Sequence, residues 1–354
     1  MTTPSLPPAA SAEHLTAALR KSGALGDGSV REVTVESSRD TLVSHITRLR
    51  LNYDGSAPDA PRSVILKVAH AAWADKLWMA GRHETAFYAE VAPLMPAGLV
   101  PRCFEASCNE DTRAWHLLLE DLTDTHFIGT PWPLPPTLGQ CEQIMRARAR
   151  FHAAWWDDPR LGSTVGSWLD DGDLNAQIES LEKQTALFIE RQNDRLSFER
   201  RDLYARLLNA GSRLQARYRS RRNMTVVHGD AHVWNIFLPK DEGQDSALQF
   251  DWDCWRVDVA TDDLAYMMAV HWYPDLRRRA ERRLLDHYHE ELLARGVRGY
   301  DRHALDEDYR LSALWHITTP LWQEANSLPP AIWWNNMERI FLAVDDLGCR
   351  ELLD

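Results

Sequence analysis

The change of hydrophobic periodicity near Leu122 is the feature that most constrains the fold of this chain. Before it, short segments alternate apolar and polar residues or form compact apolar runs, such as Ser-Val-Ile-Leu-Lys-Val at 63–68, which is the pattern of strands. After it, the segments 140–156 and 174–219 carry apolar residues at helical spacing. The sequence therefore predicts an α+β protein with a small, mostly antiparallel N-terminal sheet and a large, mainly helical C-terminal part.

The same change of pattern predicts two lobes. The chain has 354 residues, which is too long for one small core and fits two domains. We expect a β-rich N-terminal lobe over residues 1–119, a hinge at 120–125 and a helical C-terminal lobe over 126–354. Within the first lobe, the Pro/Ala/Ser-rich residues 1–10 are expected to form a disordered tail.

Composition and charge narrow the classes of function. Acidic residues number 52 against 40 basic residues, and the formal charge is -12. Such a protein repels nucleic acids and anionic membrane surfaces, so we expect neither as a partner. No apolar run is long enough to cross a bilayer, and residues 1–12 lack the features of a signal peptide. Five cysteines without a CxxC pair are expected to be free thiols. We expect a cytoplasmic protein, monomeric or homodimeric.

The most informative stretch lies in the second half of the chain. The segment 226–230, Val-Val-His-Gly-Asp, is followed by Asn235, and the apolar run 248–250 leads into Asp251. In both cases a strand delivers a carboxylate to its polar end. Phosphoryl transfer needs a carboxylate to orient the acceptor hydroxyl, oxygen ligands for Mg²⁺ and a lysine for the phosphates. Asp230 suits the first role, and Asn235 and Asp251 suit the second.

These motifs resemble the aminoglycoside phosphotransferase and choline kinase-like family. The resemblance rests on His228-Gly229-Asp230 with Asn235, on Phe250-Asp251-Trp252, and on 258–265, which matches an Asp-x-x-x-Asp-Leu-Ala signature with one extra spacer residue. It implies a two-lobed protein-kinase-like fold that uses ATP and Mg²⁺. By this resemblance Asp230 is catalytic, Asn235 and Asp251 bind the metal, and Asp263 is a buried anchor of the catalytic loop.

Lys67 and Glu84 support this interpretation independently. Lys67 lies inside the apolar strand 63–68, and a buried ammonium needs a carboxylate or phosphate partner. A helix is expected over 73–91, with Glu84 on its apolar face. A lysine from a strand and a glutamate from a helix form the ion pair by which kinases aim the lysine at the phosphates. The alternative is an edge-strand Lys67 that reaches solvent.

The remaining nucleotide contacts are implied by the resemblance alone. The segment 117–122 corresponds to the family's hinge, where backbone groups at Glu120 and Leu122 would bind adenine. No glycine-rich loop is present over the phosphates, and 36–40 occupies its place. There the hydroxyl or backbone N–H groups of Ser37 and Ser38 are expected to serve. Trp252 stands where the family often has a small residue or Phe.

The acceptor is expected to be a small molecule with a hydroxyl group. Members of the family phosphorylate aminoglycosides, choline, sugars and steroid-like alcohols. The acidic charge favours a cationic acceptor, whereas the 15 tryptophans favour an apolar or ring-shaped one, and both remain open. The candidate acceptor-binding residues are His232, Asp253, Trp272, Trp315 and Trp322.

Two other functions fit parts of the sequence. A metal-dependent phosphoesterase could use the histidines and Asp230 of the segment 228–232. The other histidines, His14 and His116 among them, are scattered and form no second motif. A kinase-like protein that binds a nucleotide without turnover would fit the altered phosphate loop. Because every group that phosphoryl transfer requires is present, we expect an ATP- and Mg²⁺-dependent small-molecule kinase.

Overall fold

The computed structural model of the chain describes residues 6–41, 44–70, 74–241 and 247–354. It divides into two compact units. The first extends to Ile128 and adds Ile236–Trp255, and the second consists of Gly129–Asn235 and Arg256–Asp354. The α+β class and the small antiparallel sheet ahead of a larger helical part are confirmed. The segment 236–255, expected within the helical lobe, belongs instead to the first unit.

The first unit contains a five-stranded antiparallel sheet in the order β1-β2-β3-β5-β4. Its strands are β1 (Ser29–Asp40), β2 (Ser44–Asp54), β3 (Ser63–Ala69), β4 (Cys103–Asn109) and β5 (Ala114–Glu120). β3 is the compact apolar run of the sequence, and it lies between β2 and β5 in the sheet. A residue in the middle of β3 therefore has neighbours on both sides, which contradicts the alternative of an edge-strand Lys67.

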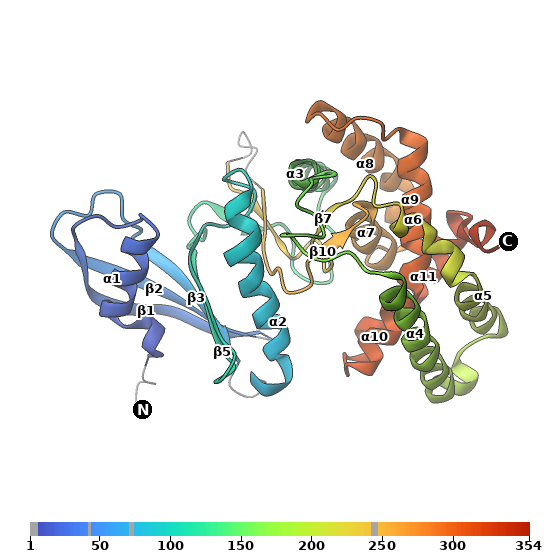
Figure 1. The fold of residues 1–354 in the computed structure, drawn as a ribbon, viewed down its shortest axis with the longest axis horizontal. Helices are drawn as coiled ribbons and strands as arrows, with labels where there is room; N and C mark the ends of the chain where they lie inside the picture. Colours follow the sequence, from blue (N-terminus) through green and yellow to red (C-terminus); the bar gives the residue numbers. More distant parts are fainter. Residues whose placement is uncertain (1–5, 42–43, 71–73, 242–246) are drawn as a thin grey trace. The chain divides into compact units, whose positions relative to one another are not determined.

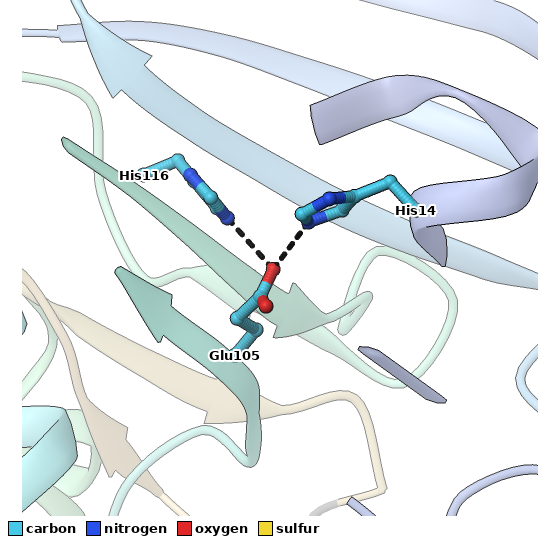
Figure 2. Close-up of side chains that lie close together, drawn as sticks. All are labelled: His14, Glu105 and His116. Atoms are coloured by element: carbon cyan, nitrogen blue, oxygen red, sulfur yellow. Dashed lines mark hydrogen bonds and ion pairs between the residues drawn. The ribbon is translucent and has the colours of Figure 1, made fainter. Parts of the chain in front are cut away.

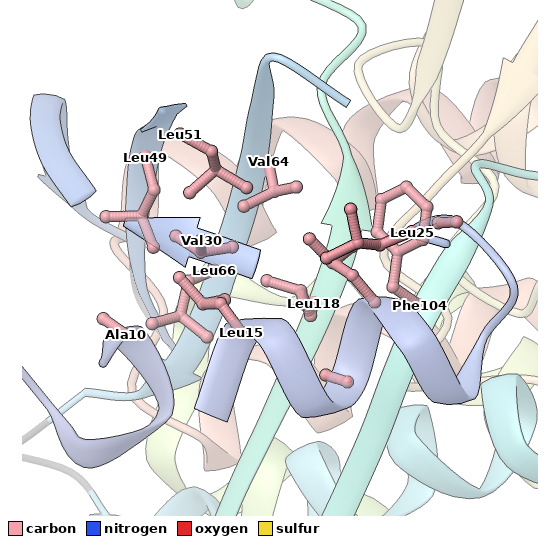
Figure 3. Packing of buried hydrophobic residues seen from close by; sticks show 13 residues of the cluster. Ala10, Leu15, Leu25, Val30, Leu49, Leu51, Val64, Leu66, Phe104 and Leu118 are labelled. Carbon is pink, nitrogen blue, oxygen red and sulfur yellow. The ribbon is translucent and has the colours of Figure 1, made fainter. Parts of the chain in front are cut away.

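Two helices, α1 (Ala12–Lys21) and α2 (Ala74–Ala86), cover opposite faces of this sheet (Figure 1). α1 begins after Ser11, whose side chain accepts a hydrogen bond from the backbone of His14, as expected for an N-cap. Leu15 of α1 packs with Leu66 and Leu118 of the sheet (Figure 3), and Leu19 of α1 belongs to the same buried core. Because side chains alternate between faces along a strand, Lys67 and its cross-strand partner Leu117 point to the α2 face.

The helical segment expected over 73–91 is present from Ala74 to Val91, and α2 forms its first part. α2 continues into the π-helical segment η2 (Phe87–Val91), and the 3-10 turn η3 (Ala92–Leu94) follows. Residues 71–73 lie outside the described residues. The first unit is completed by a small sheet of β6 (His126–Ile128), β8 (Ile236–Pro239) and β9 (Leu248–Gln249), in the order β6-β8-β9.

The expectation of a disordered tail over residues 1–10 is wrong for its last residues. Pro8–Ala10 forms the 3-10 turn η1, and Ala10 is fully buried in the core beneath α1. The apolar residues of this Pro/Ala-rich segment were the missed signal, because Ala10 packs into that core. Residues 1–5 lie outside the described residues.

The second unit is mainly helical. Its α-helices are α3 (Leu138–Trp155), α4 (Asp171–Gln192), α5 (Phe198–Leu214), α6 (Ala216–Arg219), α7 (Thr261–Ala265), α8 (Pro274–Ala294), α9 (Arg302–Trp315), α10 (Thr319–Ala325) and α11 (Pro330–Asp346). Its shorter turns are η4 (Asn193–Arg195), the π-helical η5 (Tyr266–Val270), η6 (His316–Thr318) and η7 (Cys349–Leu353). β7 (Thr225–Val227) pairs with β10 (Arg256–Asp258) in an antiparallel ribbon.

Local sequence explains where the long helices of this unit begin. Thr137 and Gln140 form a capping box at the start of α3, and Asp170 and Asp173 form another at the start of α4. α3 packs against α8, and β7 lies beside α3. This packing fixes the start of the loop that follows β7. In the part of the chain that the structure describes, no helix is long and apolar enough to span a membrane.

Candidate active site

Lys67 is the centre of a charged cluster in the first unit. Its Nζ lies 2.6 Å from Oε2 of Glu84 and 2.5 Å from Oδ1 of Asp251. Lys67 and Glu84 are buried, whereas the side chain of Asp251 keeps 40% of its surface exposed. The predicted pair of a strand lysine and a helix glutamate is confirmed. The ammonium also holds Asp251, the carboxylate predicted to bind metal.

Aromatic contacts lock the loop after β9 onto α2 and η2. Trp252 is fully buried, and its ring stacks on Phe87 with centroids 4.1 Å apart and an interplanar angle of 2°. Trp255 stacks on His83, accepts a hydrogen bond from its ring and donates one to its backbone. Trp252 is also a residue at which the sequence departs from the family pattern. Its large ring fills the space beside Phe87 and so fixes its neighbour Asp251.

The backbone of Asp251 is itself unusual. Its φ angle is +70°, in the left-handed region, which aspartate tolerates better than most residues because its short side chain can bond locally. Residues other than glycine that are held in this region cluster at functional sites. Here the conformation turns the carboxylate at the end of β9 toward Lys67.

The charges of this cluster depend on one another. Burial acts to lower the pKa of Lys67, but Asp251 and Glu84 outweigh it, so the pKa lies above its ordinary value and the ammonium stays charged. Burial raises the pKa of Glu84, and Asp251 adds to this effect against the opposing charge of Lys67. The cluster therefore contains one charged ammonium beside two carboxylates, and the pKa of one of these, Glu84, is raised.

In the second unit, the loop after β7 carries Asp230 and Asn235. The side-chain amide of Asn235 donates to both the backbone oxygen and Oδ2 of Asp230, at 3.1 Å each. Asn235 is buried, and Asp230 is partly buried. Two of the residues predicted for catalysis and metal binding thus lie in direct contact. Gly229, just before Asp230, has φ +79°, a turn that favours glycine.

Asp263 anchors this loop, as expected from its place in the signature. Its carboxylate is fully buried and accepts hydrogen bonds from the backbone N–H groups of His228, at 2.9 Å, and Gly229, at 3.0 Å. His152 lies 3.2 Å from the same carboxylate, and Arg148 lies 3.7 Å from it. Burial acts to raise the pKa of Asp263, but these groups outweigh it and hold the pKa well below its ordinary value.

Aromatic and imidazole rings surround Asp230. His232 places Nε2 3.4 Å from Oδ2 of Asp230, and its ring lies near those of Trp234 and His271. Tyr266 hydrogen-bonds the Asp230 carboxylate. Burial acts to raise the pKa of Asp230, but His232, Tyr266 and other neighbours outweigh it, so the pKa is lowered. Asp230 is therefore ionised at neutral pH.

The other predicted nucleotide-binding residues fall in strands or strand ends. Ser37 and Ser38 were expected in a loop, but they belong to β1 and pair with Arg48 and Thr47 of β2. Both are exposed. β1 continues to Asp40 and β2 begins at Ser44, and residues 42–43 lie outside the described residues. The expectation failed because the polar side chains of 36–40 are tolerated on an exposed edge strand.

The predicted hinge begins at the end of β5. Glu120 is the last residue of that strand, and its carboxylate accepts a hydrogen bond from the backbone of Arg102. The backbone oxygen of Leu122 accepts from Thr125 and His126 in the turn that follows. The structure therefore places Glu120 in the sheet and Leu122 just beyond it.

The candidate acceptor residues do not share one environment. His232 contacts Asp230, whereas Asp253 lies on the loop after β9 in the first unit, with Asp251. Trp272 is buried, Trp315 is partly buried and Trp322 is 54% exposed. Of this set, only His232 lies on the loop that carries Asp230 and Asn235.

Some residues of the site gave little signal in the sequence. Arg148 lies buried in the middle of α3, and its guanidinium donates to the backbone oxygen of Ala231 in the loop that carries Asp230. An arginine on an apolar helix face was the available signal. Tyr266 and His271 reach Asp230 through η5, and a π-helical turn shifts side chains off the 3.6-residue period. Periodicity alone could not place them.

The comparisons with known proteins bear on the fold and on the family of the chain. Three solved structures share the fold, at identities too low to carry more than the fold. They are a choline kinase from Cryptosporidium parvum (TM-score 0.56, 10% identity, covering 97% of this chain and 98% of that one), a candidate aminoglycoside phosphotransferase from Ralstonia eutropha (0.57, 14%, 97% and 98%) and a choline/ethanolamine kinase family protein from Mesorhizobium loti (0.54, 13%, 90% and 91%).

No curated protein matches the sequence significantly. A family model does match, over residues 38–156 and 168–296, which include Lys67, Glu84, Asp230, Asn235 and Asp251. The matched segments make up most of the chain. They include the charged cluster around Lys67 and the loop that carries Asp230 and Asn235. The protein therefore belongs to the ecdysteroid kinase-like family, a kinase-like phosphotransferase family.

Proposed function

We propose that this protein transfers the γ-phosphoryl group of ATP to a hydroxyl group of a small molecule, with Mg²⁺ as the metal. The observation that carries the proposal is the buried ammonium of Lys67 between Glu84 and Asp251. Burying a charge is costly unless it is paired, and a lysine held in this way stays protonated. A fixed cation next to a metal-binding carboxylate suits the phosphate oxygens of a nucleotide.

The donor set supports a hard divalent cation. Mg²⁺ prefers oxygen ligands, and Asp251 offers a carboxylate that is partly exposed while Asn235 offers an amide oxygen. We assign Mg²⁺ binding to these two residues. When bound, the metal would supply positive charge against the phosphate oxygens. Lys67 would add its own charge, and Glu84 would keep the lysine in place.

Asp230 is assigned the role of orienting the acceptor hydroxyl and taking its proton. Its lowered pKa keeps it ionised at neutral pH, so it can orient a hydroxyl and take its proton. The hydrogen bonds from Asn235 and the anchoring by Asp263 hold the carboxylate before the acceptor binds, which favours a positioned transfer. His232, beside Asp230, is the residue we assign to the acceptor.

The rest of the nucleotide is assigned to the first unit. We propose that backbone groups at Glu120 and Leu122 bind the base, and that Ser37 and Ser38 of β1 serve the phosphates. We further propose the cytoplasm as the compartment, where ATP is abundant. The family name makes polyhydroxylated steroid-like alcohols the first acceptor class to test, ahead of cationic amino alcohols and amino sugars.

The test is acceptor-dependent release of ADP by the full chain across these three classes of alcohol, with mass spectrometry of the product. We expect one class to give ADP and a monophosphorylated product. Asp230→Asn should slow that release by roughly 10²–10⁴-fold and leave ATP binding intact. Binding of ATP with Mg²⁺ but no turnover with any alcohol would support a kinase-like binding protein instead. Absence of nucleotide binding would contradict the proposal.

A further inference from the structure

A second cluster of chemically active side chains lies in the first unit, away from Lys67. Nε2 of His14 is 2.6 Å from Oε2 of Glu105, and Nε2 of His116 is 2.7 Å from the same oxygen (Figure 2). The two imidazole rings meet edge to face, with centroids 5.4 Å apart. One ligand atom from each residue lies within 4.8 Å of the other two.

The three side chains come from three elements. His14 stands in the first turn of α1, Glu105 in β4 and His116 in β5 (Figure 2). β4 and β5 are neighbours in the sheet, and the register shift between Cys103 and Glu105 brings Glu105 toward His116. The cluster is therefore a product of the tertiary fold, which explains why the sequence shows these histidines as scattered.

The cluster lies across the sheet from the proposed nucleotide site. Lys67 is opposite Leu117 in the register, and His116 is the next residue along β5. Successive side chains of a strand point to opposite faces, so His116 faces α1 while Lys67 faces α2. The cluster is thus separate from the groups assigned to phosphoryl transfer, and none of the three motifs that carry the family resemblance includes it.

From this geometry we propose that His14, Glu105 and His116 bind one Zn²⁺ ion. Two imidazole nitrogens and one carboxylate oxygen form a common donor set for zinc with three protein ligands. The side chains are 34%, 21% and 16% exposed in that order, which leaves access for a water as the fourth ligand. Zinc needs ligand atoms ~3.3 Å apart at tetrahedral angles, so the histidines have to withdraw by less than ~1 Å.

The chemistry separates this site from a Mg²⁺ site. Mg²⁺ is a hard cation that takes oxygen ligands, and a set with two imidazoles does not attract it. A zinc ion here joins α1 to β4 and β5. Because binding to the folded state alone stabilises it by mass action, zinc should raise the midpoint of thermal unfolding.

The test uses the full chain, freed of metal by a chelator and then dialysed against Zn²⁺ in an excess of Mg²⁺. Bound zinc is measured by elemental analysis, and affinity by competition with a chromogenic chelator. We expect the wild type to hold one equivalent more than the double variant H14Q/H116Q, whose amides preserve polarity and approximate size. His303→Gln is the control, since His303 is 80% exposed and belongs to the second unit.

Thermal unfolding gives a second readout. Zinc should raise the midpoint for the wild type and His303→Gln, and leave it unchanged for Glu105→Gln and the double variant. Equal zinc content and affinity in the wild type and the double variant would overturn the proposal. If the variants fail to fold, metal binding by the wild type alone still tests the site. Cobalt(II) should give it visible absorption bands with imidazole ligation, and a wild type that binds neither zinc nor cobalt refutes the site.

Discussion

Nζ of Lys67 lies 2.5 Å from Oδ1 of Asp251, although 184 positions separate the two residues in the chain. Asp251 reaches the lysine in a left-handed backbone conformation, and Trp252 behind it is stacked on Phe87. The loop after β9 is therefore shaped around the ammonium of β3. Lys67, Glu84 and Asp251 form one electrostatic unit, and a change in one of them alters the other two.

Lys67→Met tests this dependence through stability. The variant leaves Glu84 buried without its cation, and breaking a buried ion pair costs about 3–5 kcal/mol. We expect urea denaturation to show a loss of unfolding free energy at the lower end of this range, because Asp251 remains partly exposed. The double variant K67M/E84Q should lose less than the sum of the single variants, with a coupling of about 1–3 kcal/mol. Strict additivity would show that the pair does not act as one unit.

Asp230→Asn tests the assigned catalytic carboxylate. Asparagine keeps the size of the side chain but accepts no proton, and general-base catalysis contributes roughly 10²–10⁴-fold. We expect kcat to fall by about this factor with the acceptor identified by ADP release, while the Kd for ATP measured by calorimetry stays the same. A near-normal kcat would remove Asp230 from the reaction.

The sequence predicted those parts of the site that depend on local pattern. Lys67 stands out because a charge inside an apolar strand requires a partner, and Glu84 because it falls on the apolar face of the next helix. The catalytic loop and Asp263 follow from short motifs. Each of these signals is contained in a few consecutive residues.

Other parts depend on packing between distant segments and left no such pattern. The approach of Asp251 to Lys67 is set by Trp252 stacking on Phe87, and the ring cluster at Asp230 is set by the π-helical turn that carries Tyr266. His14 and Glu105 are 91 residues apart and meet only because α1 covers β4 and β5. Polar residues at 36–40 predict a loop as readily as an exposed strand, which is what β1 is.

Asp263→Asn should destabilise the second unit. The carboxylate accepts two backbone hydrogen bonds and faces His152 and Arg148, and losing such a buried charge costs about 3–5 kcal/mol. Burial opposes ionisation of Asp263, but its partners depress the folded pKa below the unfolded value of ~3.9. The stabilising contribution is therefore complete above about pH 4 and is lost as pH falls toward the folded pKa.

Urea denaturation across acidic and neutral pH measures this difference. The gap in unfolding free energy between wild type and Asp263→Asn should be constant near neutrality and shrink in acid. A gap that persists unchanged at the lowest accessible pH would assign the effect to packing instead of charge. Asp173→Asn is a suitable control, since that exposed carboxylate caps α4 outside the catalytic loop.

His271 predicts a second pH dependence, at milder pH. Burial and the neighbouring His232 lower its pKa to about 3, while the unfolded value is ~6.5. As pH falls below ~6.5, His271 becomes protonated in the unfolded chain but stays neutral in the folded chain. The free energy of unfolding therefore falls by at most ~1.4 kcal/mol per pH unit until the folded pKa is reached. His271→Asn keeps a donor for the backbone oxygen of Tyr266 and should remove this slope. Parallel curves for wild type and variant between pH 6 and 4, read from urea denaturation, would refute it.

Two helical glycines should respond in opposite ways to alanine. A Cβ on Gly81 of α2 would stand 2.0 Å from Cε2 of Trp115, a buried indole. Overpacking of this kind costs typically about 1–3 kcal/mol. A Cβ on Gly139, near the start of α3, meets nothing within 4 Å, and Gly→Ala in a helix gains roughly 0.5–1 kcal/mol. We therefore expect thermal unfolding to show a lower midpoint for Gly81→Ala and a higher one for Gly139→Ala. Because the chemical change is the same, a raised midpoint for both variants would mean that α2 does not pack on Trp115 as closely as described.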